Sequence, residues 1–599
     1  MCFGYQIINK TKTYQSFRLT TSHGFPICQQ LLSLVGKWPT IYLSGRKNGG
    51  VVVNANEIQA SMDTTNRFVR AKIRTCLIVD SDTISAWQAR ALQSNLDIID
   101  IVEVLYCTNL RSRKKFVKNF CYYFLNIFAI QNIWTKRTSW APYIGFNSKI
   151  HYFEARSKGI WELIPEENLD QIRTAQVDLV IKFGMGLLRD PQNLSARYGV
   201  LSFHHGDPRR YRGRPSGFYE LLEDAQHVGA VVQELSNVLD GGKIRAFGSY
   251  QITRHSYRKS LEHLYQQSAY LLRIAIENCL SESYVDISCT GKNYTLPSNF
   301  TVIRFVISIL RRRARRMLYG LFFRKLWSVG STTVWTEHNR GKSDLKIIQI
   351  IPKPRGVFFL ADPFVIGNGS LLCEGSGIRQ ERGFLVRIGG SPSVNLLHSN
   401  ELNDKHLSYP FPVLLSGHTF VLPEMAEHGP QKIFKLSDDD ELIDGQLLLG
   451  LEDYRLIDPT LIYHSETWWL FAGIVGSEQD TLNLWFSQQP TGPFSAHKMN
   501  PVVRDPSKAR GAGALFVSNG KLFRPGQNNC FGYGNGITIS EVLQLDHDNY
   551  REEPVSTLSI DGLKGPHTYS ANSEFAYVDF YQDKFYALAW YLRIKSRLN

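Results

Sequence analysis

The sequence predicts a multidomain protein, in which an α/β domain with a mostly parallel sheet precedes an all-β domain, a five-bladed β-propeller. Two patterns predict this order. Apolar strands alternate with helical stretches in the first half, and a strand–turn–strand motif recurs about every 50 residues in the second. At 599 residues the chain is also too long for a single hydrophobic core.

The composition indicates a globular protein with anionic partners. Hydrophobic residues make up 43% of the chain and charged residues 20%, which excludes a disordered protein. A net charge of +14 favours phosphates, nucleotides or acidic lipids, although an ordinary basic surface would give the same value. Nucleic acid is not expected as a partner, because no zinc-finger, RRM or KH signature is present.

The cysteines and the N-terminal residues predict a cytoplasmic protein. The nine cysteines lie between Cys2 and Cys530 without a CxxC pair or metal-ligand spacing, so we expect free thiols and no metal site. The first residues lack a signal-peptide pattern, and no uncharged apolar stretch is long enough to span a bilayer.

Four segments are predicted along the chain. Residues 1–70 stay unassigned, with a strand-like TIYLSG and a Gly-Gly turn. Residues 71–250 form the α/β domain, in which strands at 72–80, 101–107, 177–184 and 198–206 accompany helices at 85–94 and 113–134. Residues 251–329 form a helical connector, and residues 330–599 form the propeller.

The connector contains a basic amphipathic stretch that we expect to be helical through Trp327. Ile303, Ile307, Leu310, Ala314, Met317 and Leu321 share one helical face, and arginines crowd the other. An interdomain helix packed on the core through its apolar face is the preferred interpretation. The alternative is peripheral contact of residues 303–327 with an anionic membrane surface.

Five repeats predict the propeller. They begin at Ala361, Tyr409, Ile457, Arg510 and Ala571, and each has a small or proline-containing lead-in, an apolar strand, a polar turn and a second apolar strand. A hairpin repeated at this spacing is typical of a propeller blade, because each blade buries its faces against its neighbours.

The lead-ins place carboxylates where a propeller binds ligands. Asp362 and Asp458 are expected to face the central axis, and Glu374 and Glu424 end the second strands of their repeats. The pattern resembles the glycoside hydrolase clans with arabinanases and fructosidases, which implies acid–base glycoside chemistry. Proline replaces an expected aspartate at position 410, so an alternative is sugar binding without catalysis, with Trp468, Trp469 and Arg510 as contributors.

A second resemblance concerns the same region. The motifs ADPF, DPTL and FRPGQ are similar to the N-terminal region of plant inositolphosphorylceramide glucosaminyltransferases, outside their glycosyltransferase part. This likeness also implies a glycan-related role.

Residues 177–244 resemble the formyltransferase family, which includes methionyl-tRNA formyltransferase and the sugar N-formyltransferases. The likeness lies in a strand ending in FGMGLL, a strand carrying His204, the turn YRGRP and the later LDGGKI. It implies a Rossmann-type fold and formyl transfer from N10-formyltetrahydrofolate to an amine. The residues that match the family's cofactor site are Phe183, Gly184, Met185, Arg212 and Gly213.

The family's catalytic asparagine, histidine and aspartate correspond to Ser202, His204 and Asp240. The histidine would take the amine proton or stabilise the oxyanion, and the aspartate would orient it. Ser202 departs from the family pattern, as does the segment 206–209 after the histidine. The alternative interpretations are that His204 is a structural hydrogen-bonding residue and that Asp240 is a turn residue.

Three functional hypotheses follow. The leading one is an enzyme that formylates an amino sugar, nucleotide-linked or lipid-linked, in glycan or glycolipid synthesis, with the propeller recognising the glycan. The second makes the propeller a glycoside hydrolase or transglycosidase that uses Asp362, Glu424 and Asp458, with Arg510 beside them. The third is a glycan-binding scaffold without enzymatic activity.

Overall fold

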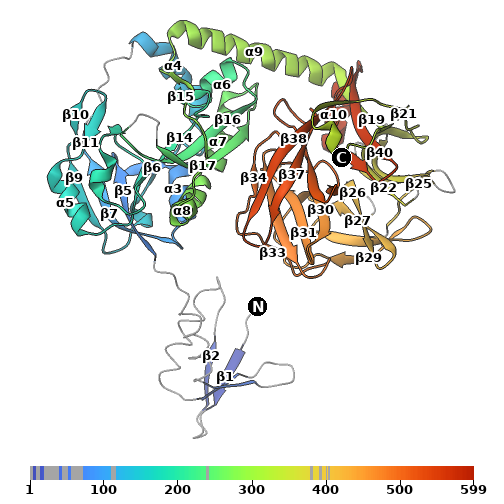
Figure 1. Cartoon of the computed structure of the whole chain (residues 1–599), viewed down its shortest axis with the longest axis horizontal. Helices are drawn as coiled ribbons and strands as arrows, with labels where there is room; N and C mark the ends of the chain where they lie inside the picture. The colour runs from blue at the N-terminus through green and yellow to red at the C-terminus, as the bar shows by residue number, and fades with distance from the viewer. Residues whose placement is uncertain are drawn as a thin grey trace. The chain divides into compact units, whose positions relative to one another are not determined.

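The protein is described by a computed structural model (Figure 1), which divides it into two compact units, Met1–Ile73 and Arg74–Asn599. The residues described are 4–8, 14–18, 40–43, 51–54, 72–109, 117–237, 242–367, 369–377, 382–389, 394–399, 401–402 and 405–598.

The first unit contains two antiparallel hairpins. Strand β1 (Gly4–Ile8) pairs with β2 (Tyr14–Arg18), and β3 (Thr40–Leu43) pairs with β4 (Val51–Asn54). The strand-like TIYLSG is therefore β3. The Gly-Gly turn at 49–50 lies outside the described residues.

The second unit begins with a seven-stranded sheet. Its strands are β5 (Ile73–Val79), β7 (Ile99–Cys107), β9 (Lys149–Phe153), β12 (Leu179–Lys182), β14 (Val200–His204), β16 (His227–Glu234) and β17 (Lys243–Gln251). They lie in the order β17-β16-β14-β12-β5-β7-β9. The pairs β5–β12, β12–β14 and β7–β9 are parallel, whereas β14–β16 and β16–β17 are antiparallel. The predicted strands are therefore present, and an antiparallel pair of strands closes one edge of the sheet.

Helices pack on this sheet, and short strands join them. The helices are α3 (Ala86–Gln93), α5 (Glu166–Thr174), α6 (Phe218–Leu222), α7 (Tyr257–Ser268) and α8 (Leu271–Leu280). The short strands are β6 (Thr83–Ser85), β8 (Arg137–Ser139), β10 (Arg156–Lys158), β11 (Trp161–Leu163), β13 (Leu187–Leu188), β15 (Tyr211–Gly213) and β18 (Lys292–Tyr294). Helix α3 begins after Ser85, whose N–H donates to Gln88 Oε1 at 2.8 Å, half of a capping box.

The helix predicted for residues 113–134 is shorter. A 3₁₀ turn, η1 (Val117–Asn119), leads into α4 (Phe120–Leu125), which continues as a π-helical turn, η2 (Asn126–Ile130). The chain then leaves the helix at Gln131, which has an extended backbone.

Helix α9 (Asn299–Phe322) connects the α/β part to the strands that follow (Figure 1). Its buried side chains are Val302, Phe305 and Ile309. The predicted helix is thus confirmed, but the predicted packing face is wrong. Ile303, Ile307, Leu310 and Met317 are 51%, 43%, 54% and 61% exposed. The helix also ends earlier than predicted, because residues 323–332 form a strand. The helical periodicity of the preceding residues hid the alternation of side chains that is typical of a strand.

The strands of residues 323–585, the five-sheet region, follow α9. They are β19 (Phe323–Thr332), β20 (Gly341–Leu345), β21 (Gln349–Ile350), β22 (Val357–Ile366), β23 (Ser370–Gly377), β24 (Gly383–Ile388), β25 (Val394–Leu396), β26 (Ser408–Leu415), β27 (His418–Glu424), β28 (Lys432–Leu436) and β29 (Leu442–Leu447). The remainder are β30 (Leu456–His464), β31 (Thr467–Ile474), β32 (Thr481–Ser487), β33 (Ser495–Ala496), β34 (Val503–Arg504), β35 (Phe516–Ser518), β36 (Lys521–Gln527), β37 (Ile537–Leu545), β38 (Tyr550–Ile560), β39 (Tyr569–Ala571) and β40 (Ala576–Phe585). Helix α10 (Ala589–Leu598) ends the described chain.

Among the described residues these strands form five sheets. Their orders are β22-β23-β24-β25, β26-β27-β28-β29, β30-β31-β32-β33 with β34 on β32, β20-β38-β37-β36-β35 and β21-β19-β40-β39. The last two sheets combine strands from both ends of the region, because β20 joins β38 and β19 joins β40. Pairing between the first and last strands holds the region together across its whole length.

The sequence repeats correspond to the first strands of the sheets. Four repeats form the predicted hairpins β22–β23, β26–β27, β30–β31 and β35–β36. The fifth differs from the prediction. Its expected turn around Gln582 lies inside β40, which pairs with β19, and its expected second strand ends in α10.

A backbone irregularity recurs in three of the sheets. Asp362, Tyr409 and Asp458 have φ values of 48°, 46° and 50°, and the pairing register shifts beside each of them. A left-handed backbone is unfavourable for a side chain other than glycine, and least so for aspartate and asparagine. The aspartates are therefore compatible with this bulge, which re-aims their side chains.

No helix among the described residues is long and apolar enough to cross a membrane.

Candidate functional site

A cavity of about 340 Å³, the central cavity, lies where all five sheets meet. It is lined by Lys325, Trp327, Phe359, Ala361, Asp362, Glu374, His406, Ser408, Glu424, Asp458, Arg510, Tyr533 and His567. Four carboxyl groups, an arginine, a lysine and the rings of Trp327, Phe359 and Tyr533 therefore surround one space. Such a mixture of convergent polar groups and ring faces is typical of a small-ligand site.

Four residues predicted for the propeller site come together here. Asp362, Glu424, Asp458 and Arg510 all line the central cavity, as does Glu374. Trp468 and Trp469, predicted as contributors to sugar binding, do not line it. Trp469 is buried among apolar residues, with its indole N–H donating to the carbonyl of His464.

The β-pairing explains why these carboxylates converge. Glu374 pairs with Ala361, the neighbour of Asp362, and Glu424 pairs with Ser408, the neighbour of Tyr409. The two glutamates thus occupy equivalent positions in adjacent sheets, beside equivalent bulges. In the second sheet the residue equivalent to the aspartate is Tyr409, not Pro410 as the sequence analysis expected. The buried hydroxyl of Tyr409 accepts from the N–H of Gly513 at 3.0 Å.

Asp458 is held as an ion pair with Arg510. The Arg510 Nε donates to Asp458 Oδ2 at 2.6 Å, and Gln527 Nε2 donates to the same oxygen at 3.3 Å. Burial opposes the charge of Arg510, but the carboxylate of Asp458 raises the pKa of the guanidinium further above its ordinary value. One negative charge is therefore fixed in the cavity wall.

Glu424 lies against this ion pair, and its surroundings favour the protonated form of its carboxyl group. Its Oε2 accepts from the main-chain N–H of Asp458 at 3.1 Å. Burial and the neighbouring Asp458 raise the pKa of Glu424 to about 8. Burial also raises the pKa of Glu374 well above its ordinary value, with Asp362 and Glu424 adding to the effect. The cavity therefore contains carboxylic acids that can donate a proton beside an ionised carboxylate.

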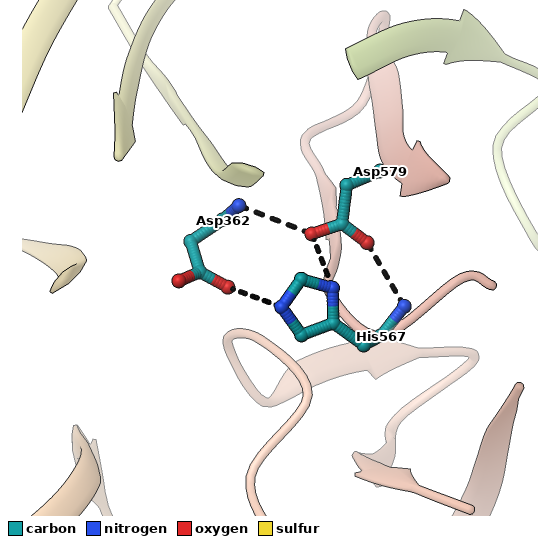
Figure 2. Close-up of side chains that lie close together, drawn as sticks. All are labelled: Asp362, His567 and Asp579. Carbon is teal, nitrogen blue, oxygen red and sulfur yellow. Dashed lines mark hydrogen bonds and ion pairs between the residues drawn. The ribbon is translucent and has the colours of Figure 1, made fainter. Parts of the chain in front are cut away.

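A second charged group lies on the other side of the cavity, where Asp362, His567 and Asp579 meet (Figure 2). His567 Nε2 lies 3.2 Å from Asp362 Oδ1, and His567 Nδ1 lies 2.6 Å from Asp579 Oδ2. The Thr568 hydroxyl donates to Asp362 Oδ1 at 2.6 Å, and the Asp362 N–H donates to Asp579 Oδ2 at 3.0 Å. Although burial disfavours the imidazolium, the two carboxylates raise the pKa of His567. Burial also raises the pKa of Asp362, although His567 opposes that effect. We therefore interpret the short contact between His567 and Asp579 as the ion pair of this group.

The same three residues offer ligand atoms within 4.8 Å of one another, a spacing that a metal ion could bridge. Metal binding would need one imidazole nitrogen to present a lone pair, but both ring nitrogens face carboxylate oxygens. The sequence search for metal spacing overlooked the group, because Asp362 and His567 are far apart in the chain.

Lys325, Trp327 and Tyr533, which also line the cavity, were not predicted. Lys325 donates to the carbonyl of Tyr533 at 2.9 Å, and burial lowers its pKa to about 8. The ring of Trp327 lies 4.2 Å from that of His567, and Arg510 lies 4.8 Å from the centre of the Tyr533 ring. Lys325 and Trp327 belong to β19, which the sequence analysis assigned to the connector helix.

In the α/β part, Phe183, Gly184 and Met185, which were predicted for the cofactor site, are closely packed. Phe183 contacts Trp87 and Phe203, with ring centres 5.9 and 6.1 Å away. A Cβ on Gly184 would lie 2.3 Å from the N of Asp80, so this glycine is required by the close approach of β5. Met185 is buried.

The predicted catalytic residues are only partly described. Ser202 and His204 lie two residues apart in β14 and therefore on one face of the sheet. Asp240 lies outside the described residues. The adjacent His205 is packed between Trp87 and Tyr265 and bonds Ser268 Oγ at 3.0 Å. Burial lowers the pKa of His205 to about 3, so this side chain is neutral.

The arginine turn after β14 is held by structural contacts. Arg209 pairs with Asp207 at 2.7 Å, and Arg212 donates to the carbonyl of Cys289 at 3.0 Å. A Cβ on Gly213, which has a φ of 85°, would lie 2.0 Å from the carbonyl oxygen of Tyr294. The cavity that His205, Arg212 and Gly213 help to line measures about 10 Å³, room for about one water molecule.

Residues 397–580 match a family model described as the N-terminal part of glucosamine inositolphosphorylceramide transferase 1. The protein of that name from Oryza sativa subsp. japonica is 32% identical over 166 residues, which is 27% of this chain and 22% of the relative. The Arabidopsis thaliana protein is 28% identical over 209 residues, 33% of this chain and 27% of the relative. The chain thus spans about a quarter of the length of these curated relatives, and the similarity falls in the five-sheet region.

Solved structures similar to the chain are of two kinds. The GH43 protein BlXynB of Bacillus licheniformis has a TM-score of 0.26 and 11% identity, and covers 37% of this chain and 47% of its own. An N-formyltransferase from Helicobacter canadensis has a TM-score of 0.26 and 12% identity, and covers 51% of this chain and 96% of its own.

Proposed function

We propose that the five-sheet region is a five-bladed propeller whose central cavity binds an amino sugar, and that the protein acts as a transferase in glycolipid synthesis. The observation that carries this proposal is the convergence of Asp362, Glu374, Glu424, Asp458 and Arg510 on one cavity. The description of the family model matched over residues 397–580 and the names of the curated relatives support the substrate class, because both mention glucosamine and a ceramide lipid.

The cavity chemistry suits a sugar with a positive charge. An ammonium group would pair with a carboxylate such as Asp362, whereas the ring face would lie on Trp327 or Tyr533. The hydroxyls would bond the carboxyl groups and Arg510. A volume of about 340 Å³ is at the small end of ligand pockets, which favours a sugar headgroup over a whole lipid.

Glu424 and Asp458 suggest how the cavity would act on a glycosidic bond. Glu424 holds a proton at neutral pH and would give it to the departing oxygen as the C1–O bond breaks. The charge of Asp458 would stabilise the positive charge that develops on the sugar ring. An acceptor hydroxyl would then form the new bond to C1 and return its proton to Glu424.

Calorimetry with glucosamine tests the binding step, with glucose as the uncharged comparison. We expect wild type to bind glucosamine more tightly than glucose. Asp362→Asn should weaken glucosamine binding by roughly 10- to 100-fold, the value of a charge-assisted hydrogen bond. The control is Glu427→Gln, an exposed carboxyl in the loop after β27, which should leave affinity unchanged. Equal affinity of wild type and Asp362→Asn, or no binding by folded wild type, would contradict the proposal.

A second candidate is formyl transfer by the α/β part, and N10-formyltetrahydrofolate stays a predicted cofactor. The observation that favours it is the register of the parallel strands β12 and β14, in which Lys182 pairs with Ser202. Because of this register, the segment 183–185 and His204 lie at the carboxyl ends of adjacent strands, at the same edge of the sheet. The names of the curated relatives do not support formyl transfer. Binding of a stable N10-formyltetrahydrofolate analogue by wild type but not by His204→Ala would favour this candidate, and no binding would exclude it.

A further inference from the structure

Helix α9 carries an exposed apolar stripe on the side away from its buried face. The stripe consists of Phe300, Ile303, Ile307, Leu310 and Met317, which are 69%, 51%, 43%, 54% and 61% exposed. The last four share one helical face, and Phe300 lies at its margin one turn before Ile303. Scattered exposed apolar residues need no explanation, but a continuous row along a helix marks an interaction surface.

Arginines border this stripe. Arg304, Arg311 and Arg315 are exposed, lie on one flank of the apolar face and form no ion pair with a described residue. No aspartate or glutamate occurs between positions 299 and 322. The remaining arginines of the helix serve a different purpose. Arg312 donates to the carbonyl of Leu221, and Arg313 to that of His255.

The neighbouring α4 and η2 extend the apolar surface. Asn299 Oδ1, at the start of α9, accepts from the N–H of Cys121 at 3.0 Å, which fixes α4 beside it (Figure 1). Along α4 and η2, four apolar side chains are at least half exposed: Phe120, Phe124, Ile127 and Phe128. The phenylalanine rings contact one another, with centres 6.4 Å apart for Phe120 and Phe124 and 5.0 Å apart for Phe124 and Phe128.

We propose that this surface, formed by α9, α4 and η2, docks on an anionic membrane surface. Its composition is that of an interfacial helix, in which apolar side chains enter the acyl boundary and arginines meet lipid phosphates. Helix α9 has 24 residues and would lie flat over about 36 Å of bilayer. The absence of acidic side chains favours a lipid surface over a second copy of the chain, because two such helices would repel each other.

The surface shares no residue with the central cavity, so membrane binding can be tested independently of sugar binding. It would place the protein beside lipid-linked substrates.

Vesicle flotation of the full chain tests the proposal. The vesicles are phosphatidylcholine alone or phosphatidylcholine with phosphatidylserine. Wild type should bind the anionic vesicles and be released by high salt. The variant Arg304→Ala/Arg311→Ala/Arg315→Ala should bind on the order of 100-fold more weakly, since each arginine near an anionic surface adds about a fivefold factor. The variant Ile303→Ser/Ile307→Ser/Leu310→Ser should also lose binding.

Matched control variants show whether loss of binding comes from this surface or from a general loss of positive charge or of exposed apolar side chains. Arg156→Ala/Arg197→Ala/Arg551→Ala removes three exposed positive charges elsewhere, and Leu187→Ser/Leu414→Ser/Val517→Ser removes three exposed apolar side chains. Both should bind anionic vesicles like wild type. The proposal is overturned if wild type does not bind, if the controls lose binding equally, or if sedimentation velocity shows a dimer that the α9 apolar variant abolishes. Circular dichroism establishes that each variant is folded.

Discussion

The carboxyl group of Glu424 is buried and lies beside the negatively charged side chain of Asp458. Its pKa of about 8 lies far above the ordinary value of 4.5, because burial and Asp458 both disfavour its ionised form. Between these two pH values the folded protein holds a proton that the unfolded chain has lost. The contribution of Glu424 to the free energy of unfolding should therefore fall as the pH rises from about 5 to about 8.

Glu424→Gln should reduce this dependence. The amide cannot ionise, and its oxygen can still accept from the N–H of Asp458. Urea unfolding at several pH values should give a slope against pH shallower than that of wild type by up to about 1.4 kcal/mol per unit. Glu427→Gln is the control, and a slope as steep in Glu424→Gln as in wild type would mean that Glu424 is ionised in the folded protein.

At the scale of elements, the pairing of β19 with β40 joins the start of the five-sheet region to its end. The two strands pair from Phe323 with Phe585 to Thr332 with Ala576. Phe580 lies in the middle of β40 and is 2% exposed, among the apolar residues around Trp335 and Tyr569. Phe585 ends the same strand and is 63% exposed.

Phe580→Ala should cost about 3–5 kcal/mol of unfolding free energy, through lost burial and the cavity left behind. Phe585→Ala removes the same side chain from an exposed position and should cost less than about 1 kcal/mol. Denaturant unfolding of both variants measures the difference. Equal effects would show that β40 does not close the region as described.

The elements also explain what the sequence could predict. The recurring lead-ins identified four hairpins, because proline, aspartate and turn residues repeat at nearly constant spacing. The prediction of the fifth hairpin was wrong, because β40 pairs with β19, a strand more than 200 residues earlier in the chain. The pattern of residues within β40 does not indicate which distant strand it pairs with. For α9, periodicity identified the helix but not which of its two apolar faces is buried.

For the whole molecule, the candidate site was predictable only where it repeats. Asp362, Glu424, Asp458 and Arg510 were found because they occupy corresponding places in successive repeats. Lys325, Trp327, Tyr533 and His567 were missed, because only the folded chain brings them to the cavity from loops and a distant strand. The side chains of the candidate site therefore gather where the sheets of the five-sheet region meet.

The central claim is that the central cavity is where a sugar binds, and photoaffinity labelling tests it most directly. A diazirine derivative of glucosamine would be cross-linked to the full chain and its attachment sites mapped by mass spectrometry. We expect labels on peptides that line the central cavity, such as those containing Asp362, Glu424 and Tyr533, and loss of label with excess glucosamine. Labels confined to the segment around His204 and Arg212, or labels that free glucosamine does not displace, would contradict the account.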